Sequence, residues 1–162
     1  DLAINGMTYG CFKNNILPIM RNGEQRRPML HIKDAIRAMK FFLNSDPEIF
    51  NGEIFNIGSE SNNYKIIHLA KKLKKFYGKK LILKWYGNAD KRSYFVSFEK
   101  IRKIGFKTLY QAEDGIKEIH DKLINKKIEK ELNTITLSWY EYLEEMNSFL
   151  NQVKINGKIL KK

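Results

Sequence analysis

The chain has 162 residues, which is enough for about one domain with a hydrophobic core of its own. Its 43% hydrophobic and 12% aromatic residues are typical of a folded globular protein and exclude a disordered one. The single cysteine, Cys11, excludes an internal disulfide and indicates a reducing, cytoplasmic location. No apolar run approaches the roughly 20 residues that span a bilayer, so we expect no membrane partner.

The formal net charge of +12 is compatible with nucleic acid, an acidic membrane surface or an anionic small molecule as a partner. Much of this charge lies around one predicted helix end, at Lys71, Lys72, Lys74, Lys75, Lys79 and Lys80. A solvated lysine-rich helix is the simpler interpretation, because base recognition typically uses arginine, asparagine and stacked aromatic side chains. We therefore do not expect nucleic acid as a partner. The histidines are scattered singly, so no metal site is predicted.

Amphipathic helices alternate with short extended segments along the chain. The hydrophobic periodicity and the turn residues predict a helix over 1–14, an extended segment at 17–20, a turn at 22–23, a helix over 34–44, a strand at 53–58, a helix over about 66–78, a strand at 81–86, and helices over 98–104, 112–123 and 139–149. Residues 126–133 are charged and typical of a linker or a helix extension. We therefore divide the chain into a lobe over 1–125 and a C-terminal helical extension and tail over 126–162.

Residues 27–39 are the stretch around which the rest of the prediction is organised. They are typical of a short strand that ends at a turn, with Asp34 starting an amphipathic helix and its carboxylate accepting hydrogen bonds from amides of the first turn. One buried stripe of this helix is predicted from apolar residues at helical spacing: Ala35, Ala38, Met39 and Leu43.

Arg27 lies just before that turn, on a stretch that its neighbours hold rigid. A guanidinium fixed in this way can bind a phosphate through two parallel hydrogen bonds. An ordinary surface arginine is the alternative interpretation for this residue taken alone.

Four stretches in a fixed order carry a family resemblance. They are Asp1-Leu2-Ala3-Ile4-Asn5, Arg27-x-x-x-His31-Ile32-x-Asp34, Phe55-Asn56-Ile57-Gly58, and Asp90-x-Arg92-Ser93-Tyr94 followed by Lys100-Ile101 and Gly105-Phe106. With them, residues 1–146 resemble the C-terminal portion of the extended short-chain dehydrogenases, the NAD-dependent nucleotide-sugar epimerases and dehydratases. The resemblance implies an α/β fold: the substrate-binding lobe of an extended Rossmann-type epimerase, with its last helix–strand crossover at about residues 32–60 and its N-terminal dinucleotide-binding sheet missing.

The resemblance also implies a binding site for a nucleoside-diphosphate sugar. In this family the residue that matches Asn5 hydrogen-bonds the diphosphate, the residue that matches Arg27 pairs with its charge, and the residue that matches Tyr94 lines the pocket. Charge-assisted bonds from arginine suit a diphosphate better than bonds from ammonium groups do.

One departure from the family pattern affects the second phosphate contact. A 4-epimerase of this family carries a further arginine three residues before the aspartate that matches Asp90, where this chain has Gly87. We therefore assign the second phosphate contact to Arg92. Asp90 is interpreted as an orienting partner for an arginine or a backbone amide, and His31 as a structural residue of the turn.

The hydride chemistry of this family uses NAD on a glycine-rich turn and a tyrosine with a lysine four residues later. The chain contains no G-x-x-G-x-x-G or G-x-G-x-x-G sequence, and its one Tyr-x-x-x-Lys, from Tyr9 to Lys13, is interpreted as accidental because only eight residues precede it. We therefore predict no catalytic residue, NAD only in the complete enzyme and no cofactor bound by this chain alone. The partner expected is a nucleoside-diphosphate sugar. Three explanations of the missing sheet stay open: a separately encoded N-terminal NAD-binding half that docks here, a truncated remnant, or a sequence that is part of a longer gene product.

Two other hypotheses remain open from the sequence. The net charge suggests a basic nucleic-acid-binding module, which would lose affinity steeply as salt rises. The predicted strand at 53–58, without the rest of a sheet, suggests a non-catalytic interaction module that recruits another chain.

Overall fold

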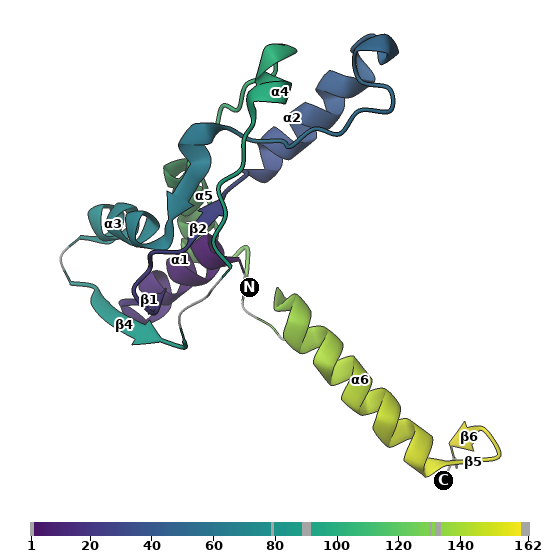
Figure 1. The fold of residues 1–162 in the computed structure, drawn as a ribbon. Coiled ribbons are helices and arrows are strands. Elements are labelled where there is room, and N and C mark those ends of the chain that lie inside the picture. Colours follow the sequence, from purple (N-terminus) through teal and green to yellow (C-terminus); the bar gives the residue numbers. More distant parts are fainter. Residues whose placement is uncertain (1, 79, 89–91, 130, 132–133, 160–162) are drawn as a thin grey trace.

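The computed structural model describes residues 2–78, 80–88, 92–129, 131 and 134–159. In chain order, its elements are α1 (Ala3–Asn14), β1 (Ile16–Met20), β2 (Arg26–Pro28), α2 (Ile32–Leu43), η1 (Pro47–Ile49), η2 (Glu60–Asn62), β3 (Asn63–Lys65), α3 (Ile66–Tyr77), β4 (Ile82–Tyr86), α4 (Glu99–Lys103), α5 (Ala112–Ile124), α6 (Thr136–Val153), β5 (Lys154–Ile155) and β6 (Lys158–Ile159). Figure 1 shows α1, α3 and α5 gathered with β1, β2 and β4, α2 beside α4, and α6 standing apart. Each predicted helix is confirmed to within a few residues.

The main core lies between β1 and the helices α1, α3 and α5. Leu17 and Ile19 on β1 are fully buried, and they pack among Cys11 of α1, Leu73 of α3 and Ile116 of α5. β1 pairs in parallel with β4, as expected for segments of an α/β fold. The predicted strand at 81–86 is thereby confirmed, although all five residues of β4 are exposed.

A second, aromatic cluster lies between α2 and α4. Its buried members are Ala38, Phe98, Ile101 and Phe106, with Phe41 and Phe42 packed against them. The rings of Phe41 and Phe106 lie 5.7 Å apart, centroid to centroid. The described residues therefore form two hydrophobic clusters rather than one continuous core.

The predicted buried stripe of α2 is wrong in its C-terminal half. Met39 is 63% exposed and Leu43 is 83% exposed, whereas Phe41 and Phe42 face the aromatic cluster. α2 has apolar residues on two faces, and periodicity alone does not tell which face packs. The face that stays open carries Ile32, Ile36, Met39 and Leu43.

The predicted strand over 53–58 is also wrong. These residues run between turns without strand pairing to any described segment, and Ile54 is 86% exposed. A strand needs a neighbour for its backbone N–H and C=O groups, and local composition does not supply one. Side chains hold the segment instead: Lys100 Nζ donates to the Ile54 carbonyl at 2.9 Å, and the rings of Phe55 and Phe42 lie 5.2 Å apart.

Asp34 has a different role from the predicted helix cap. His31 is the N-cap of α2, and its Nδ1 accepts a hydrogen bond from the Lys33 amide at 3.2 Å. The Asp34 carboxylate is fully buried and accepts from the amides of Leu109 and Tyr110 at 3.0–3.1 Å. Arg37 Nη1 lies 2.5 Å from Asp34 Oδ1 and donates to the Lys107 carbonyl at 3.0 Å. The carboxylate therefore ties α2 to the segment that leads into α5.

We predict that Asp34→Ala lowers the free energy of unfolding by about 3–5 kcal/mol, because it leaves a guanidinium and two amides without their buried partner. Urea denaturation measures this change. Asp46→Ala is the matched control, because Asp46 caps the exposed η1 with one hydrogen bond of 3.0 Å to the Glu48 amide and should cost only about 1 kcal/mol. Equal losses in the two variants would contradict the role given to Asp34.

Two acidic groups in the main core link stability to alkaline pH. Burial raises the pKa of the Cys11 thiol to about 11 and the pKa of the Tyr77 hydroxyl to about 12, from ordinary values of 9.0 and 10.0. The unfolded chain therefore loses these two protons at a lower pH than the folded chain does. Their contribution to stability is complete below about pH 9 and is lost as the pH rises through the two raised values.

We predict that the urea midpoint of the protein falls between about pH 8 and pH 11 for this reason. Cys11→Ala should lower the urea midpoint at pH 8, because it removes buried packing. Between pH 8 and pH 11, however, the midpoint of the variant should fall less than that of the unaltered protein, because the thiol no longer titrates. Chemical denaturation at several pH values measures both effects. An equally steep fall in the variant would show that Cys11 does not contribute.

Candidate functional site

Arg27 occupies the middle of β2, opposite Tyr64 of the antiparallel strand β3. Its Nη1 donates to the Arg26 carbonyl at 2.7 Å and also to the Arg92 carbonyl. Its Cζ atom lies 5.1 Å from the centre of the Tyr94 ring. The structure thus brings Arg27 together with the segment that carries Arg92 and Tyr94, although 65 residues separate Arg27 from Arg92.

The two arginines of β2 rest on the two aromatic rings of that same segment. Arg26 Cζ lies 5.9 Å from the Phe95 ring centre, beside the Arg27–Tyr94 pair. Cation–π contacts of this kind hold a guanidinium plane in place, and a planar guanidinium fixed in this way suits an anion. Tyr94 and Phe95 are 50% and 59% exposed, so the arrangement lies at the surface.

Polar side chains hold residues 93–98 against β2 and β3. Asn63 Nδ2 donates to the Val96 carbonyl at 2.9 Å, and the Val96 amide donates back to Asn63 Oδ1 at 3.1 Å. The Arg26 amide donates to Ser93 Oγ at 3.0 Å, and the Phe98 amide donates to Glu60 Oε1 at 3.2 Å. The buried side-chain amide of Asn63 therefore satisfies the backbone N–H and C=O groups of Val96, as a neighbouring strand would.

Sequence reasoning did not identify Asn63. Its only signal is the Asn62-Asn63 pair before Tyr64, and such pairs are common in turns. The contact to Val96 is made over 33 residues, so no local pattern indicates it.

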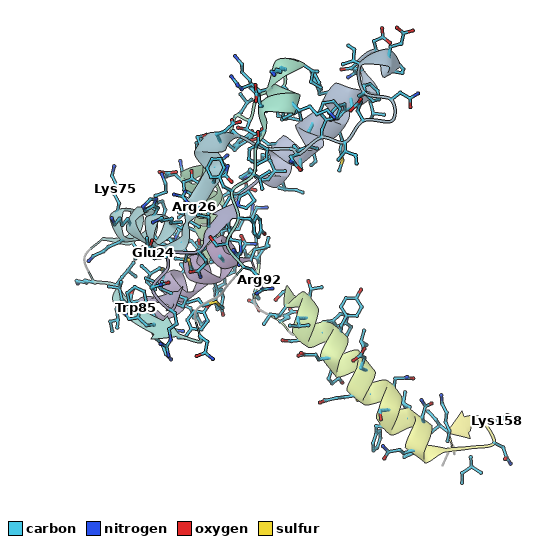
Figure 2. All side chains as sticks on the ribbon, viewed as in Figure 1. Glu24, Arg26, Lys75, Trp85, Arg92 and Lys158 are labelled. Atoms are coloured by element: carbon cyan, nitrogen blue, oxygen red, sulfur yellow. The ribbon has the colours of Figure 1, made fainter. Side chains whose placement is uncertain are left out.

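The remaining residues singled out from the sequence are Asn5, Arg92, His31 and Asp90. Asn5 lies exposed on the first turn of α1, and its grouping with Arg27 stays a prediction. Arg92 is exposed, and Figure 2 labels it together with Arg26. His31 stacks on Tyr110 with ring centroids 4.6 Å apart, in agreement with a structural role. Asp90 lies outside the described residues.

A surface hollow of about 550 Å³ lies at the carboxyl ends of β1 and β4. Arg21, Asn22, Trp85, Tyr86 and Gly87 line it. Arg21 closes one side through two contacts: its amide donates to the Tyr86 carbonyl at 3.0 Å and its Nε donates to the Gly87 carbonyl at 2.9 Å. Sequence reasoning did not predict this hollow.

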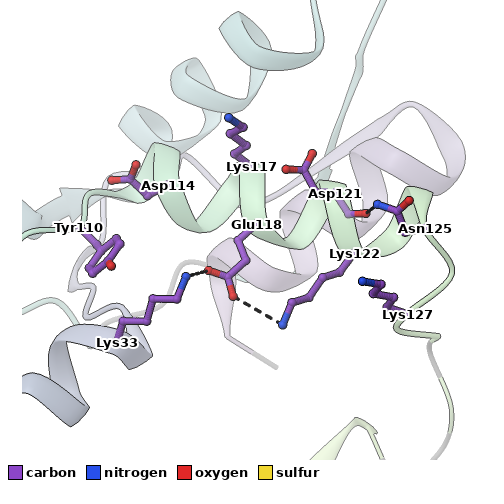
Figure 3. Close-up of a pocket in the computed structure, with 9 residues that line it drawn as sticks. All are labelled: Lys33, Tyr110, Asp114, Lys117, Glu118, Asp121, Lys122, Asn125 and Lys127. Carbon is purple, nitrogen blue, oxygen red and sulfur yellow. Dashed lines mark hydrogen bonds and ion pairs between the residues drawn. The ribbon is translucent and has the colours of Figure 1, made fainter.

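A second hollow, of about 490 Å³, runs along α5 (Figure 3). Glu118 lies at its centre, 2.7 Å from Lys33 Nζ and 3.5 Å from Lys122 Nζ. The hydrogen bond from Lys33 holds the pKa of Glu118 below its ordinary value. Since Glu118 pairs with two of the lining lysines, and Asp114 and Asp121 also line the hollow, it is a poor site for an anion. No three His, Cys, Asp or Glu residues are grouped as metal ligands in the described ranges.

No helix in the described part of the chain is long and apolar enough to cross a bilayer.

Comparison with known proteins agrees with the fold. Residues 4–58 match the NAD dependent epimerase/dehydratase family. The matched residues include Asn5, Arg27 and Asp34, and they end at Gly58.

Curated relatives from Arabidopsis thaliana include UDP-D-apiose/UDP-D-xylose synthase 2, which is 36% identical over 74 residues covering 43% of this chain and 19% of the relative. A trifunctional UDP-glucose 4,6-dehydratase, epimerase and reductase is 28% identical over 109 residues, covering 65% of this chain and 16% of the relative. The chain therefore matches under a fifth of the length of these epimerase/dehydratase relatives.

Solved structures show the same fold over most of the chain. dTDP-glucose 4,6-dehydratase from Bacillus anthracis, solved in complex with NAD, superimposes with a TM-score of 0.63 at 22% identity, covering 78% of this chain and 40% of that chain. GDP-D-glycero-L-gluco-heptose synthase from Campylobacter jejuni gives a TM-score of 0.53 at 17% identity, covering 74% of this chain and 43% of that chain. The α/β, Rossmann-type epimerase fold predicted from the sequence is confirmed.

We predict that Asn63→Ala lowers the free energy of unfolding by about 1–3 kcal/mol, because the Val96 amide and carbonyl lose a buried partner. Thermal or urea denaturation measures the loss. Asn56→Ala is the matched control: its Nδ2 donates to the Ser97 carbonyl at 3.3 Å from an exposed position, so its effect should stay within about 0.5 kcal/mol. A larger loss in the control would contradict the importance of Asn63.

Proposed function

We propose that this chain supplies the part of an NAD-dependent epimerase or dehydratase that binds a nucleoside-diphosphate sugar, and that Arg27 binds the diphosphate. The observation that carries the proposal is the fixed guanidinium of Arg27, which is held by the Arg92 carbonyl and the Tyr94 ring within a family-matched stretch. The sugar nucleotides in the names of the relatives and of the solved structure, UDP-sugars and dTDP-glucose, support the ligand class.

The binding chemistry follows from the charges at β2. A diphosphate carries about two negative charges, and each charge-assisted hydrogen bond contributes roughly 1.5–3 kcal/mol. Nη1 of Arg27 is occupied by backbone carbonyls, so the guanidinium is fixed in orientation before the ligand arrives. In this proposal Tyr94 lines the pocket, while Asn5 and the side chain of Arg92 supply further contacts to the phosphates.

NAD does not fit the residues of this chain. A dinucleotide site needs a glycine-rich turn between a strand and a helix, and the sequence has no such motif. Tyr9 and Lys13 lie one turn apart on α1, a helix that packs between α3 and α5 rather than beside a dinucleotide site. We therefore propose that the NAD-binding half lies outside these residues, that this chain is inactive without it, and that no reaction step runs on this chain alone.

Two exposed surfaces suit such a half as a docking site. The open face of α2 carries Ile32, Ile36 and Met39, each about half exposed or more, and the unpaired segment at 53–58 lies next to the same aromatic cluster. A contiguous apolar face with an unpaired extended segment is typical of a sheet–helix interface. The proposal assigns both surfaces to the NAD-binding half.

We predict that the chain binds UDP-glucose or dTDP-glucose weakly in calorimetric titration, and that Arg27→Ala reduces the affinity about ten- to a hundredfold, the equivalent of one lost charge-assisted contact. Arg102→Ala is the matched control, because it removes the same charge from an exposed position on α4. No binding by the unaltered chain, even with a family NAD-binding half present, would overturn the proposal, as would equal losses in the two variants.

A further inference from the structure

α6 has an apolar stripe along its whole length. The stripe repeats at intervals of three and four residues: Trp139, Tyr142, Leu143, Met146, Phe149, Leu150 and Val153. This spacing corresponds to positions a, d and e of a heptad over about two and a half heptads. The rings of Trp139 and Tyr142 stack 5.9 Å apart, which keeps the stripe continuous at its start.

Nothing in the described part of the chain buries this stripe. α6 contains no buried residue, and it extends away from the rest of the molecule (Figure 1). Tyr142 is 41% exposed and Phe149 is 57% exposed. Most of the stability of a helix in a protein comes from the packing of its apolar face, so the exposed stripe of α6 indicates a partner.

The charges of α6 argue against a membrane surface. Glu141, Glu144 and Glu145 lie off the stripe, and the helix has no lysine or arginine. Helices that bind anionic lipid surfaces carry basic residues on the polar face, so anionic lipid would repel this helix.

The same charges suit a second copy of α6 in antiparallel orientation. Lys154 follows the end of the stripe, and Lys158 lies at the far end of the helix, where Figure 2 labels it. When two copies cross antiparallel at Met146, Lys154 of one copy comes within about one turn of Glu141 of the other. The opposed helix dipoles favour this orientation, and no carboxylate enters the apolar interface.

The area is also sufficient for a weak to moderate dimer. A buried aromatic side chain accounts for about 150–250 Å², so the exposed halves of Tyr142 and Phe149 in two copies supply roughly 300–500 Å². Leu143, Met146, Leu150 and Val153 add to this from both helices. The total approaches the roughly 1,200 Å² at the lower limit of stable interfaces.

We infer that α6 pairs antiparallel with α6 of a second copy of this chain and makes the protein a homodimer. The pairing does not involve β2 or the Arg27 site. It can therefore fail while the sugar-nucleotide proposal holds, and the reverse is equally possible.

Light scattering during size-exclusion chromatography of the full chain tests the inference. We expect a species of twice 19.1 kDa that dissociates on dilution. Leu143→Glu with Leu150→Glu should give a monomer at every concentration, whereas the control Ser148→Glu with Asn151→Glu adds the same charge off the stripe and should remain a dimer. A monomeric unaltered chain, including one in which α6 folds onto its own body, would overturn the inference, as would a dimer that survives the stripe substitutions.

Disulfide cross-linking in a Cys11→Ser background tests the orientation and does not depend on the stability of the variants. Met146→Cys lies at the crossing point, so two copies should oxidise to a covalent dimer. Val153→Cys should not cross-link, because antiparallel pairing moves its two copies to opposite ends. Cross-linking of both variants would indicate parallel pairing and overturn the antiparallel assignment, and cross-linking of neither would overturn the pairing itself.

Discussion

The buried carboxylate of Asp34 connects two hydrophobic clusters that otherwise have little in common. One cluster lies between β1 and the helices α1, α3 and α5, and the other lies between α2 and α4. Asp34 lies in the first turn of α2, the helix that packs into the aromatic cluster. Its oxygens accept hydrogen bonds from the amides of residues 109 and 110, which come just before α5, a helix of the main core. The hydrogen bonds of Asp34 are directional, whereas apolar contact is not, so they add to the packing of α2 a constraint on its direction.

The proposed binding site uses the same kind of support. β2 and β3 form a pair of only three residues each, which is too small to hold a third segment by strand pairing alone. Asn63 and Ser93 supply the missing hydrogen bonds and hold residues 93–98 beside β2, so that Tyr94 and Phe95 lie against the two arginines. Arg27 therefore keeps one orientation, which is the property that a diphosphate-binding guanidinium needs.

The exposed apolar surfaces fall into two groups, one at or beside the family-matched residues and one on α6. The open face of α2 and the segment at 53–58 lie next to the aromatic cluster, within or beside the family-matched residues, and we assign them to an NAD-binding half. The stripe of α6 lies outside those residues, and we assign it to a second copy of the chain. The two assignments concern separate surfaces, so both partners can be present at once.

The sequence by itself determined the helices and the order of the family motifs, because periodicity and motif spacing are properties of neighbouring residues. Only the tertiary structure decided which face of α2 is buried, that residues 53–58 do not pair as a strand, and that Asp34 joins two clusters instead of capping its own helix. The role of Asn63 was likewise hidden from the sequence. Each of these depends on a partner many residues away, such as Val96 for Asn63 or Leu109 for Asp34, and hydrogen bonds over such separations leave no local pattern.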